Sequence, residues 1–283
     1  MENKRLQQLQ TPIAKEEEFM PIFLDTGNIK EIEKYLKMGI IRGVTTNPTI
    51  LLKDGVTGGM KGVRARSAEI ARLIDPLPLS VEVTTNDPLQ MRSQAQELAA
   101  MASNIIVKIT IHGPIGELEN LEVIHELEGE RNIRVNATAM MSAQQCLLAA
   151  MAGATYVSLF GGRIANMGYN PCEEIIRLRK VLDNFNLKAK IIIGSTREVL
   201  NIIEWLGAGA HFVTVVPNLL EGMIVHPYSK ETVRMFLADA AKIEAQLEAD
   251  HSFPTEKRDD NKGEALISHS KQKPVIQEHK AQV

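Results

Sequence analysis

The stretch LSVEVTTNDPLQMRSQAQELAAMASNIIVKIT, residues 79–110, places one helix candidate between two short strand candidates. Its ends, residues 79–84 and 105–110, are rich in β-branched apolar residues, which favour strands. The Asp87-Pro88 pair predicts the start of the helix over residues 87–102, because aspartate caps helix N-termini and proline fits the first helical position. A strand, helix and strand in this order indicate parallel strands joined by a crossover helix.

The same alternation extends along the chain in both directions. Six further strand candidates lie at residues 22–26, 43–47, 134–139, 156–161, 190–195 and 212–217. Helical patterns lie between them at residues 28–38, 63–74, 142–152, 172–185 and 196–206, with Gly153 and Gly207 at expected left-handed C-caps. Eight repeats in about 225 residues match an α/β (β/α)8 TIM barrel better than an open doubly wound sheet. No G-x-G-x-x-G follows the first strand, which removes the dinucleotide-binding interpretation.

Composition and tail segments set the domain limits. The chain has 283 residues, 44% of them hydrophobic and 24% charged, with a net charge of -3, so it does not belong to the disordered, collagen-like or coiled-coil classes. Residues 1–19 and 250–283 are polar, and we expect a flexible N-terminal extension and a disordered tail. Residues 20–249 are expected to form the catalytic barrel. An additional C-terminal helix at residues 230–247 should pack across it or onto a neighbouring subunit.

The charge balance and the cysteines bear on partners and cofactors. Near-neutral charge argues against nucleic-acid binding, and the absence of a long apolar run argues against a membrane partner. The N-terminus MENKRLQQLQ has no apolar signal region, so we expect a cytoplasmic protein. Cys146 and Cys172 have no metal-ligand spacing and should be reduced and structural. We expect no metal and no organic cofactor.

Polar residues interrupt nearly every strand candidate toward its carboxyl end, although strands buried on both faces should be continuously apolar. In a (β/α)8 barrel these ends and the loops after them converge on one small volume, where active sites lie. The sequence therefore predicts a polar cluster drawn from most of the strands. Its members are Asp25, Thr45, Asn47, Glu82, Lys108, Asn136, Thr138, Ser158 and Ser195.

Lys108 is the most informative of these residues, because burying an unpaired ammonium costs several kcal/mol or more. A desolvated lysine can attack a carbonyl and form a Schiff base. The alternative is a structural ion pair with Glu82 or Asp25, and both roles are compatible. The two carboxylates could supply the proton transfers of Schiff-base chemistry, and Thr138 with Asn136 could hold a catalytic water.

Two arginines follow later strands. Arg163 stands in FGGRIANMG and Arg197 in GSTREVL, where a helix is expected to start. Arginine beside a helix N-terminus and glycine-rich backbone favours an anionic oxygen cluster such as a phosphate. Surface ion pairs are the alternative for both residues.

Seven motifs in this order, FLDTGN, GVTTNPTI, SVEVT, IIVKI, VNATAM, AGATYVSLFGGRI and GSTREV, resemble the small transaldolase and fructose-6-phosphate aldolase family. The resemblance runs from about Phe23 to Pro227 and implies a class I aldolase barrel acting on sugar phosphates, with a homo-oligomer expected. It implies a Schiff-base role for Lys108, proton transfer by Asp25, and water binding by Glu82 with Thr138. The implied contacts to substrate hydroxyls and phosphate come from Thr45, Asn47, Asn136, Ser158, Arg163, Ser195 and Arg197.

Two positions separate the branches of that family. Glu82 and Phe160 resemble true transaldolase, whereas the aldolase branch carries glutamine and tyrosine there. The resemblance therefore implies transfer of a dihydroxyacetone unit from fructose 6-phosphate or sedoheptulose 7-phosphate to an aldose phosphate. The alternatives are a fructose-6-phosphate aldolase and a non-catalytic sugar-phosphate-binding barrel. The chain departs from the family pattern at four positions expected near the acceptor end, namely Thr110, His112, Ala165 and Asn166.

Overall fold

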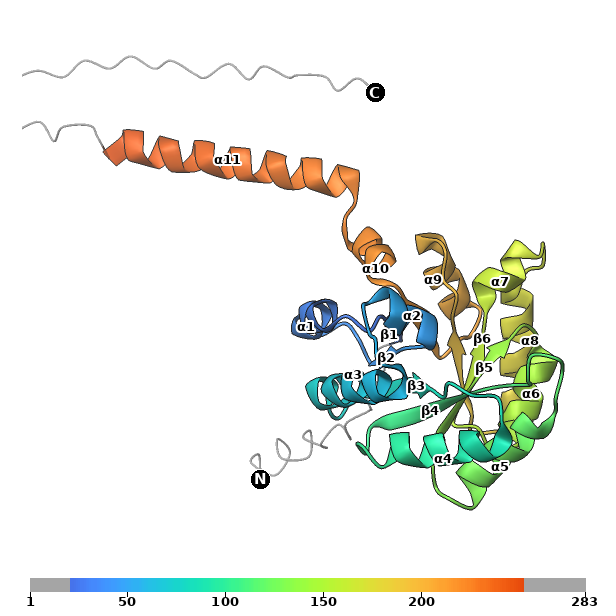
Figure 1. Ribbon diagram of the computed structural model, residues 1–283. Helices are drawn as coiled ribbons and strands as arrows, with labels where there is room; N and C mark the ends of the chain where they lie inside the picture. Colours follow the sequence, from blue (N-terminus) through green and yellow to red (C-terminus); the bar gives the residue numbers. More distant parts are fainter. Residues whose placement is uncertain (1–20, 252–283) are drawn as a thin grey trace, which may run out of the picture. The chain divides into compact units, whose positions relative to one another are not determined.

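The computed structural model describes residues 21–251, and within them eight parallel strands close into one barrel in sequence order (Figure 1). Each strand pairs with the next along the chain, and β8 pairs with β1. This topology confirms the predicted TIM barrel. The strands are β1 (Ile22–Asp25), β2 (Gly43–Thr45), β3 (Leu79–Glu82), β4 (Ile105–Thr110), β5 (Val135–Met140), β6 (Tyr156–Leu159), β7 (Lys190–Ile193) and β8 (Phe212–Val215).

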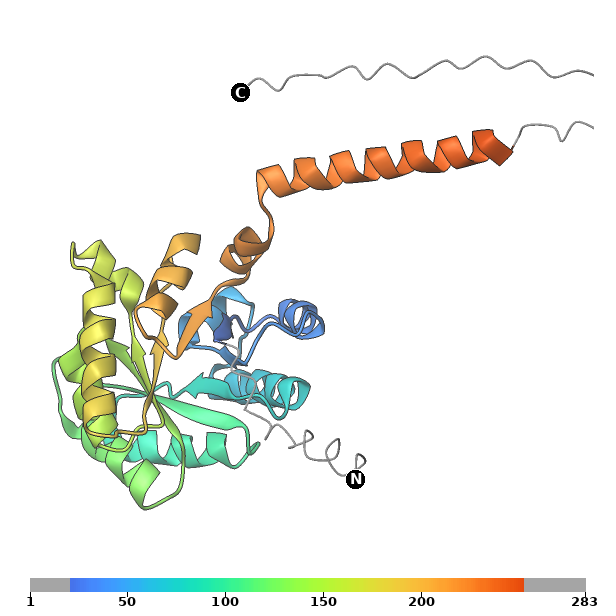
Figure 2. The same cartoon turned by 180° about the vertical axis from the view of Figure 1, so that it is seen from behind.

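Helices follow the strands and form the outer layer (Figure 2). The Asp87 carboxylate accepts a hydrogen bond from the Gln90 amide and so caps the helix between β3 and β4, as predicted. Gly153 is left-handed (φ +104°), as predicted, but Gly207 is a helical residue and Gly209 (φ +107°) takes the left-handed position. The helices of the barrel unit are α1 (Ile29–Lys37), α2 (Pro48–Lys53), α3 (Gly59–Ile74), α4 (Pro88–Ala99), α5 (Glu119–Gly129), α6 (Ala143–Met151), α7 (Gly161–Asn166), α8 (Pro171–Asn184), α9 (Val199–Gly207) and α10 (Pro217–Ile224).

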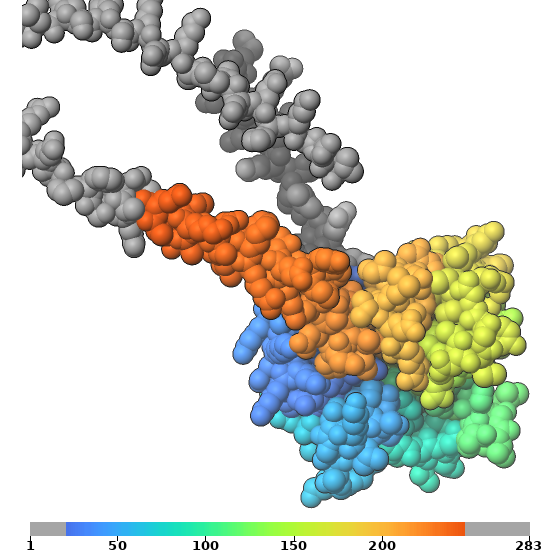
Figure 3. Space-filling view, turned by 90° about the horizontal axis from the view of Figure 1, so that it is seen from above, coloured from blue at the N-terminus to red at the C-terminus, as the bar shows by residue number. Residues whose placement is uncertain are grey.

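The first and last helices of this unit lie together where the barrel closes. Tyr35 on α1 donates a hydrogen bond to the Pro217 carbonyl oxygen at 2.9 Å, and Lys34 lies 3.5 Å from the Glu221 carboxylate on α10. The space-filling view shows these blue and orange segments in contact (Figure 3). Closure between β1 and β8 is thus supported on the outside of the barrel as well as within the sheet.

The inside of the barrel changes from apolar to polar along its length. Phe23, Ile192 and Phe212 form a separate buried cluster near the amino ends of the strands, and the two phenylalanine rings meet edge to face at 5.0 Å. Side chains alternate along a strand, so Asp25 and Thr214, two residues further on than Phe23 and Phe212, point inward at the carboxyl end. The apolar cluster therefore closes one end of the barrel, and polar groups line the other.

The chain divides after His226 into two compact units, and α11 (Pro227–His251) is the described part of the second. This helix includes the predicted range 230–247, and its apolar residues Val233, Phe236, Leu237 and Ile243 are exposed. The packing of this helix across the barrel or onto a neighbouring subunit stays a prediction. The expectations for residues 1–19 lie outside the described residues, as do those for the tail beyond His251. None of the described helices is both long and apolar enough to cross a membrane.

Candidate active site

A cavity of about 490 Å³ opens at the carboxyl end of the barrel. All twelve residues predicted for the site line it, although they come from seven strands or the loops and helices that follow them. The geometry therefore brings together what the sequence distributes over more than 170 residues. The twelve are Asp25, Thr45, Asn47, Glu82, Lys108, Asn136, Thr138, Ser158, Phe160, Arg163, Ser195 and Arg197.

Lys108 lines this cavity and is only 6% exposed. Glu82 is its register partner on β3, and the Glu82 carboxylate oxygen Oε2 lies 3.2 Å from Lys108 Nζ. The same Nζ donates a hydrogen bond to the Thr46 carbonyl oxygen at 3.0 Å. The predicted ion pair is thus present, and it leaves one of the three ammonium hydrogens for a further contact.

Asp25 lies at the end of β1 with its carboxylate in the cavity. The Thr45 hydroxyl donates a hydrogen bond to Asp25 Oδ1 at 2.6 Å. Burial raises the pKa of Asp25, while the Thr45 hydrogen bond and the charge of Lys108 lower it and the charge of Asp54 raises it further. Burial has the largest effect, so Asp25 holds a proton more readily than an exposed aspartate does.

A hydrogen-bonded row crosses the floor beside Lys108. Ser158 donates to Asn136 Oδ1 at 2.7 Å, and Asn136 Nδ2 donates to the Ser80 hydroxyl at 3.1 Å. These contacts fix the orientation of the Asn136 amide next to its register partner Lys108. The Thr138 hydroxyl is buried and has no hydrogen-bond partner among the described residues, so it is available to a water or substrate group.

The arginines lie at the mouth of the cavity. Arg163 and Arg197 are exposed, and neither forms an ion pair within residues 21–246, which argues against the surface ion-pair interpretation. The Arg163 guanidinium lies 5.5 Å from the centre of the Phe160 ring. Helix α9 has the acidic Glu198 as its N-cap, so an anion site here would depend on the arginines and not on that helix N-terminus.

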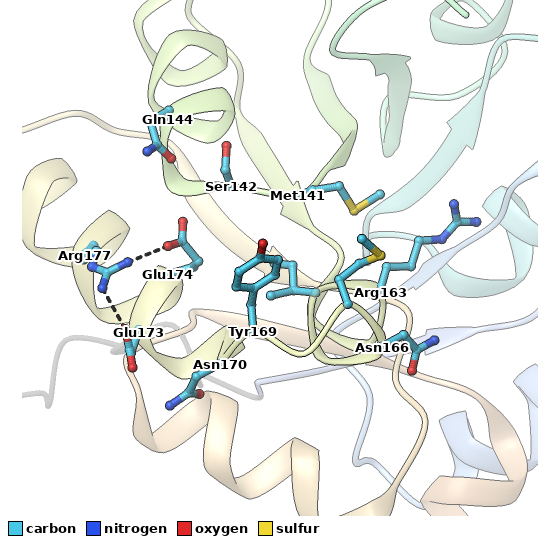
Figure 4. Close-up of a pocket in the computed structure, with 12 residues that line it drawn as sticks. Met141, Ser142, Gln144, Arg163, Asn166, Tyr169, Asn170, Glu173, Glu174 and Arg177 are labelled. Atoms are coloured by element: carbon cyan, nitrogen blue, oxygen red, sulfur yellow. Dashed lines mark hydrogen bonds and ion pairs between the residues drawn. The ribbon is translucent and has the colours of Figure 1, made fainter.

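A second cavity, of about 710 Å³, adjoins the first at Arg163, which lines both. Figure 4 shows Tyr169, Met141 and Asn166 around it, with Arg163 at one side. Asn166 is one of the four departures from the family pattern, and it belongs to this second cavity.

The departures near β4 lie elsewhere. Thr110 and His112 do not line the candidate active site: the Thr110 hydroxyl accepts a hydrogen bond from Asn120 Nδ2 at 3.0 Å, and His112 is exposed. Ala165 lines neither cavity. Of the four departures, only Asn166 lines either of these two cavities, and the location of the acceptor end stays a prediction.

Six lining residues were not predicted. They are Pro48, Thr49, Ile50, Ala139, Gly194 and Thr214. Thr214 carried a signal, because it is a polar residue within the apolar run of β8. Ala139 gave no signal in the sequence. Its backbone is left-handed (φ +62°), a conformation that is rare for alanine and that the residue type therefore does not predict. Cys146 and Cys172 are free, and no group of three or more potential metal ligands occurs in the part of the chain that the structure describes.

Comparison with known proteins places this geometry in context. Residues 22–262 match the family model described as transaldolase/fructose-6-phosphate aldolase. A probable transaldolase from Carboxydothermus hydrogenoformans is 39% identical over 220 residues, covering 78% of this chain and 97% of that protein. A probable transaldolase from Thermoplasma acidophilum is 38% identical over 224 residues, covering 79% and 96% respectively. Among solved structures, a thiamine phosphate pyrophosphorylase from Pyrococcus furiosus is similar with a TM-score of 0.50. It has 12% identity and covers 70% of this chain and 85% of its own, a likeness that concerns the fold alone.

Proposed function

This chain belongs to the transaldolase/fructose-6-phosphate aldolase family, and we propose that it transfers a dihydroxyacetone unit between sugar phosphates through a Schiff base on Lys108. The donor is a ketose phosphate, either fructose 6-phosphate or sedoheptulose 7-phosphate, and the acceptor is an aldose phosphate. The observation that carries the proposal is a buried lysine amine held 3.2 Å from the Glu82 carboxylate in a polar cavity. Once this ammonium has given a proton to Glu82, the free amine is a nucleophile for a ketone.

The first step forms the Schiff base. The Lys108 ammonium gives one proton to Glu82, and the free amine attacks the C2 carbonyl. The former carbonyl oxygen takes two protons, one from the nitrogen and one back from Glu82, and leaves as water when the nitrogen lone pair forms the C=N bond. Glu82 is placed to exchange these protons through a water, because its carboxylate already contacts Nζ. Thr138 supports this role as a buried hydroxyl without a partner among the described residues, able to hold that water.

The second step breaks the C3–C4 bond. Asp25 takes the proton from the C4 hydroxyl, the C4 oxygen becomes an aldehyde carbonyl, and the C3–C4 electron pair moves into the iminium to give an enamine. Burial raises the pKa of Asp25, which suits a group that takes a proton here and returns it when the acceptor binds. The aldose phosphate then accepts the enamine carbon by the reverse sequence.

The remaining residues are assigned to substrate binding. Asn136 and Ser158 lie beside Lys108 and can contact the dihydroxyacetone hydroxyls, together with Thr45 and Asn47. Arg163, Arg197 and Ser195 lie at the mouth, where two guanidinium groups can hold the phosphate. This assignment gives one polar end for the reacting carbons and one cationic end for the phosphate.

Transfer is favoured over simple cleavage by the residues at two positions. Phe160 is apolar and has no hydroxyl, while Glu82 is a carboxylate engaged with Lys108. A tyrosine hydroxyl and a neutral amide would help water to release dihydroxyacetone, whereas this pair leaves the enamine waiting for an aldehyde. Water therefore competes poorly with the acceptor.

The test is a transfer assay with purified protein, fructose 6-phosphate and erythrose 4-phosphate, with sedoheptulose 7-phosphate measured as product. We expect product with the wild-type chain, none with Lys108→Met, and little free dihydroxyacetone when the acceptor is omitted. Rapid release of dihydroxyacetone without acceptor would favour the aldolase instead. Binding of fructose 6-phosphate without any turnover would favour a non-catalytic barrel.

A further inference from the structure

Thr214 lies in the candidate active site but has no role in the mechanism above. It is on β8, it is 7% exposed, and it lines the same cavity as Asp25 and Lys108. Its hydroxyl oxygen lies 2.5 Å from the Thr45 hydroxyl oxygen of β2. Strands β8 and β2 flank β1 on either side, so this contact passes across the strand that carries Asp25.

The number of hydrogens fixes the direction of this contact. A threonine hydroxyl carries one hydrogen and two acceptor lone pairs, and an ionised carboxylate only accepts. Thr45 gives its single hydrogen to Asp25 Oδ1 at 2.6 Å. The hydrogen between the two threonines must then come from Thr214.

The geometry points to Thr214 as a positioning residue that donates its hydrogen to Thr45 and thereby holds the Thr45 hydroxyl in the orientation that serves ionised Asp25. The backbone of Thr214 is fixed in turn, since the Thr196 hydroxyl donates to the Thr214 carbonyl oxygen at 2.7 Å. Hydrogen bonds in such a chain polarise one another, so the bond to Asp25 is stronger with Thr214 present.

The hydrogen-bonded chain of the two threonine hydroxyls also gives the two carboxylate oxygens of Asp25 different surroundings. Oδ1 accepts from Thr45, whereas Oδ2 has no hydrogen bond to any of the described residues. In the proposed reaction the proton of the C4 hydroxyl therefore goes to Oδ2, and Oδ1 keeps its bond. This inference rests on the proposed function only for the identity of that proton.

Several charged groups face Asp25 and act on it together with the hydroxyl chain. Lys108 on β4 favours the carboxylate, and Asp54, which follows α2, disfavours it. Glu82 on β3 forms an ion pair with Lys108, and Glu82 and the two arginines line the same cavity as Asp25. Substitution of Thr214 replaces none of these charged groups. A shift in the pKa of Asp25 on substitution therefore measures the effect of the two threonine hydroxyls.

The test replaces Thr214 with valine, which keeps the shape and removes the hydroxyl. Two measurements are made: the pH dependence of kcat/KM for transfer, and a direct titration of the Asp25 carboxyl by 13C NMR, assigned with Asp25→Asn. In Thr214→Val we expect the pKa of Asp25 and the acid limb of the profile to rise by about half a pH unit. This is about a threefold loss of kcat/KM on that limb.

Conservative and control variants make the result specific. Thr214→Ser restores the hydroxyl and should restore the wild-type pKa, and Thr214→Val should add nothing to Thr45→Val, because the effect passes through Thr45. Ser67→Ala removes another buried hydroxyl, one that has no partner among the described residues and lies on α3, and should leave the titration unchanged.

The outcomes separate this inference from the proposed function. An Asp25 titration that is unchanged in folded Thr214→Val, or additive shifts in the double variant, overturns the role of Thr214 even if transfer is normal. If the wild-type chain catalyses no transfer at all, the proposed function is overturned instead. The NMR titration still decides the role of Thr214 in that case, since it needs no turnover.

Discussion

Gly162 lies where α7 meets the loop after β7, and its missing side chain allows the two proposed phosphate-binding segments to approach each other. A Cβ built on Gly162 would lie 1.8 Å from the Ser195 carbonyl oxygen and 3.0 Å from Arg197 Cγ. Because real Cβ contacts do not fall below 3.0 Å, Gly162→Ala forces the two segments apart by at least about 1.2 Å. The displaced atom belongs to the backbone, so no side-chain rotation relieves the overlap.

A displacement of this size should act mainly on the phosphate end of the substrate. A misplacement of about 1 Å can cost on the order of 100-fold in rate, so we expect kcat/KM for fructose 6-phosphate to fall about 10- to 100-fold, mostly through KM. The assay compares fructose 6-phosphate with unphosphorylated fructose, for which the loss should be smaller. Gly207→Ala is the matched control, since its Cβ would meet nothing within 4 Å. An unchanged KM for the phosphate ester in folded Gly162→Ala would refute the placement of the phosphate between these segments.

Three further predictions follow from other parts of the chain. Glu82→Gln combined with Phe160→Tyr should increase release of free dihydroxyacetone from fructose 6-phosphate without acceptor, measured enzymatically; an unchanged release rate contradicts the account of branch selection. Burial and then nearby Arg179 lower the pKa of His211 to about 4, so the unfolded chain binds the extra proton first and stability falls as pH drops below about 6.5. At pH 4.5 this costs about 2 kcal/mol, and urea unfolding should show wild type losing about that much relative to His211→Asn between pH 7 and 4.5. Light scattering should give a homo-oligomer for the wild-type chain, and Phe236→Asp on α11 should reduce its mass if this helix contacts a neighbouring subunit.

The barrel was predictable because its strands differ sharply from their surroundings. Runs such as Ile105–Thr110 are short and β-branched, and they alternate with capped helices, so their number and order could be inferred without any tertiary information. The bounds of β4 agree with the prediction, β5 is shifted by one residue toward the C-terminus, and the other six strands end one or two residues earlier than expected. Strand ends are less certain because the last residues of a run continue into the loops that build the site.

The cap after α9 shows where local patterns become insufficient. Gly207 and Gly209 both follow the apolar pattern, and only Gly209 takes a left-handed conformation. The choice depends on packing that is remote in sequence: the Ala210 amide bonds the Trp205 carbonyl oxygen, and Trp205 is fully buried in the core. Nothing in the two glycines themselves distinguishes them.

The candidate site could be predicted where charge made a residue conspicuous, and less well where it did not. Lys108 within IIVKIT contradicts the apolar character of a buried strand, so it demanded a functional or ionic explanation. Thr214 within FVTVVP is a weaker signal, because it is uncharged and threonine is common in strands. Ser195 was predicted as a polar residue, but its left-handed backbone (φ +61°) was not, since only the loop around it requires that conformation.

The central claim is that Lys108 is the residue that binds the ketose covalently. Borohydride reduction in the presence of fructose 6-phosphate, followed by trypsin digestion and mass spectrometry, tests it directly. A modified Lys108 resists trypsin, so the account predicts a reduced sugar adduct on an uncleaved peptide of residues 93–131. Cleavage after an unmodified Lys108, with the adduct on another lysine or with no adduct at all, would contradict it.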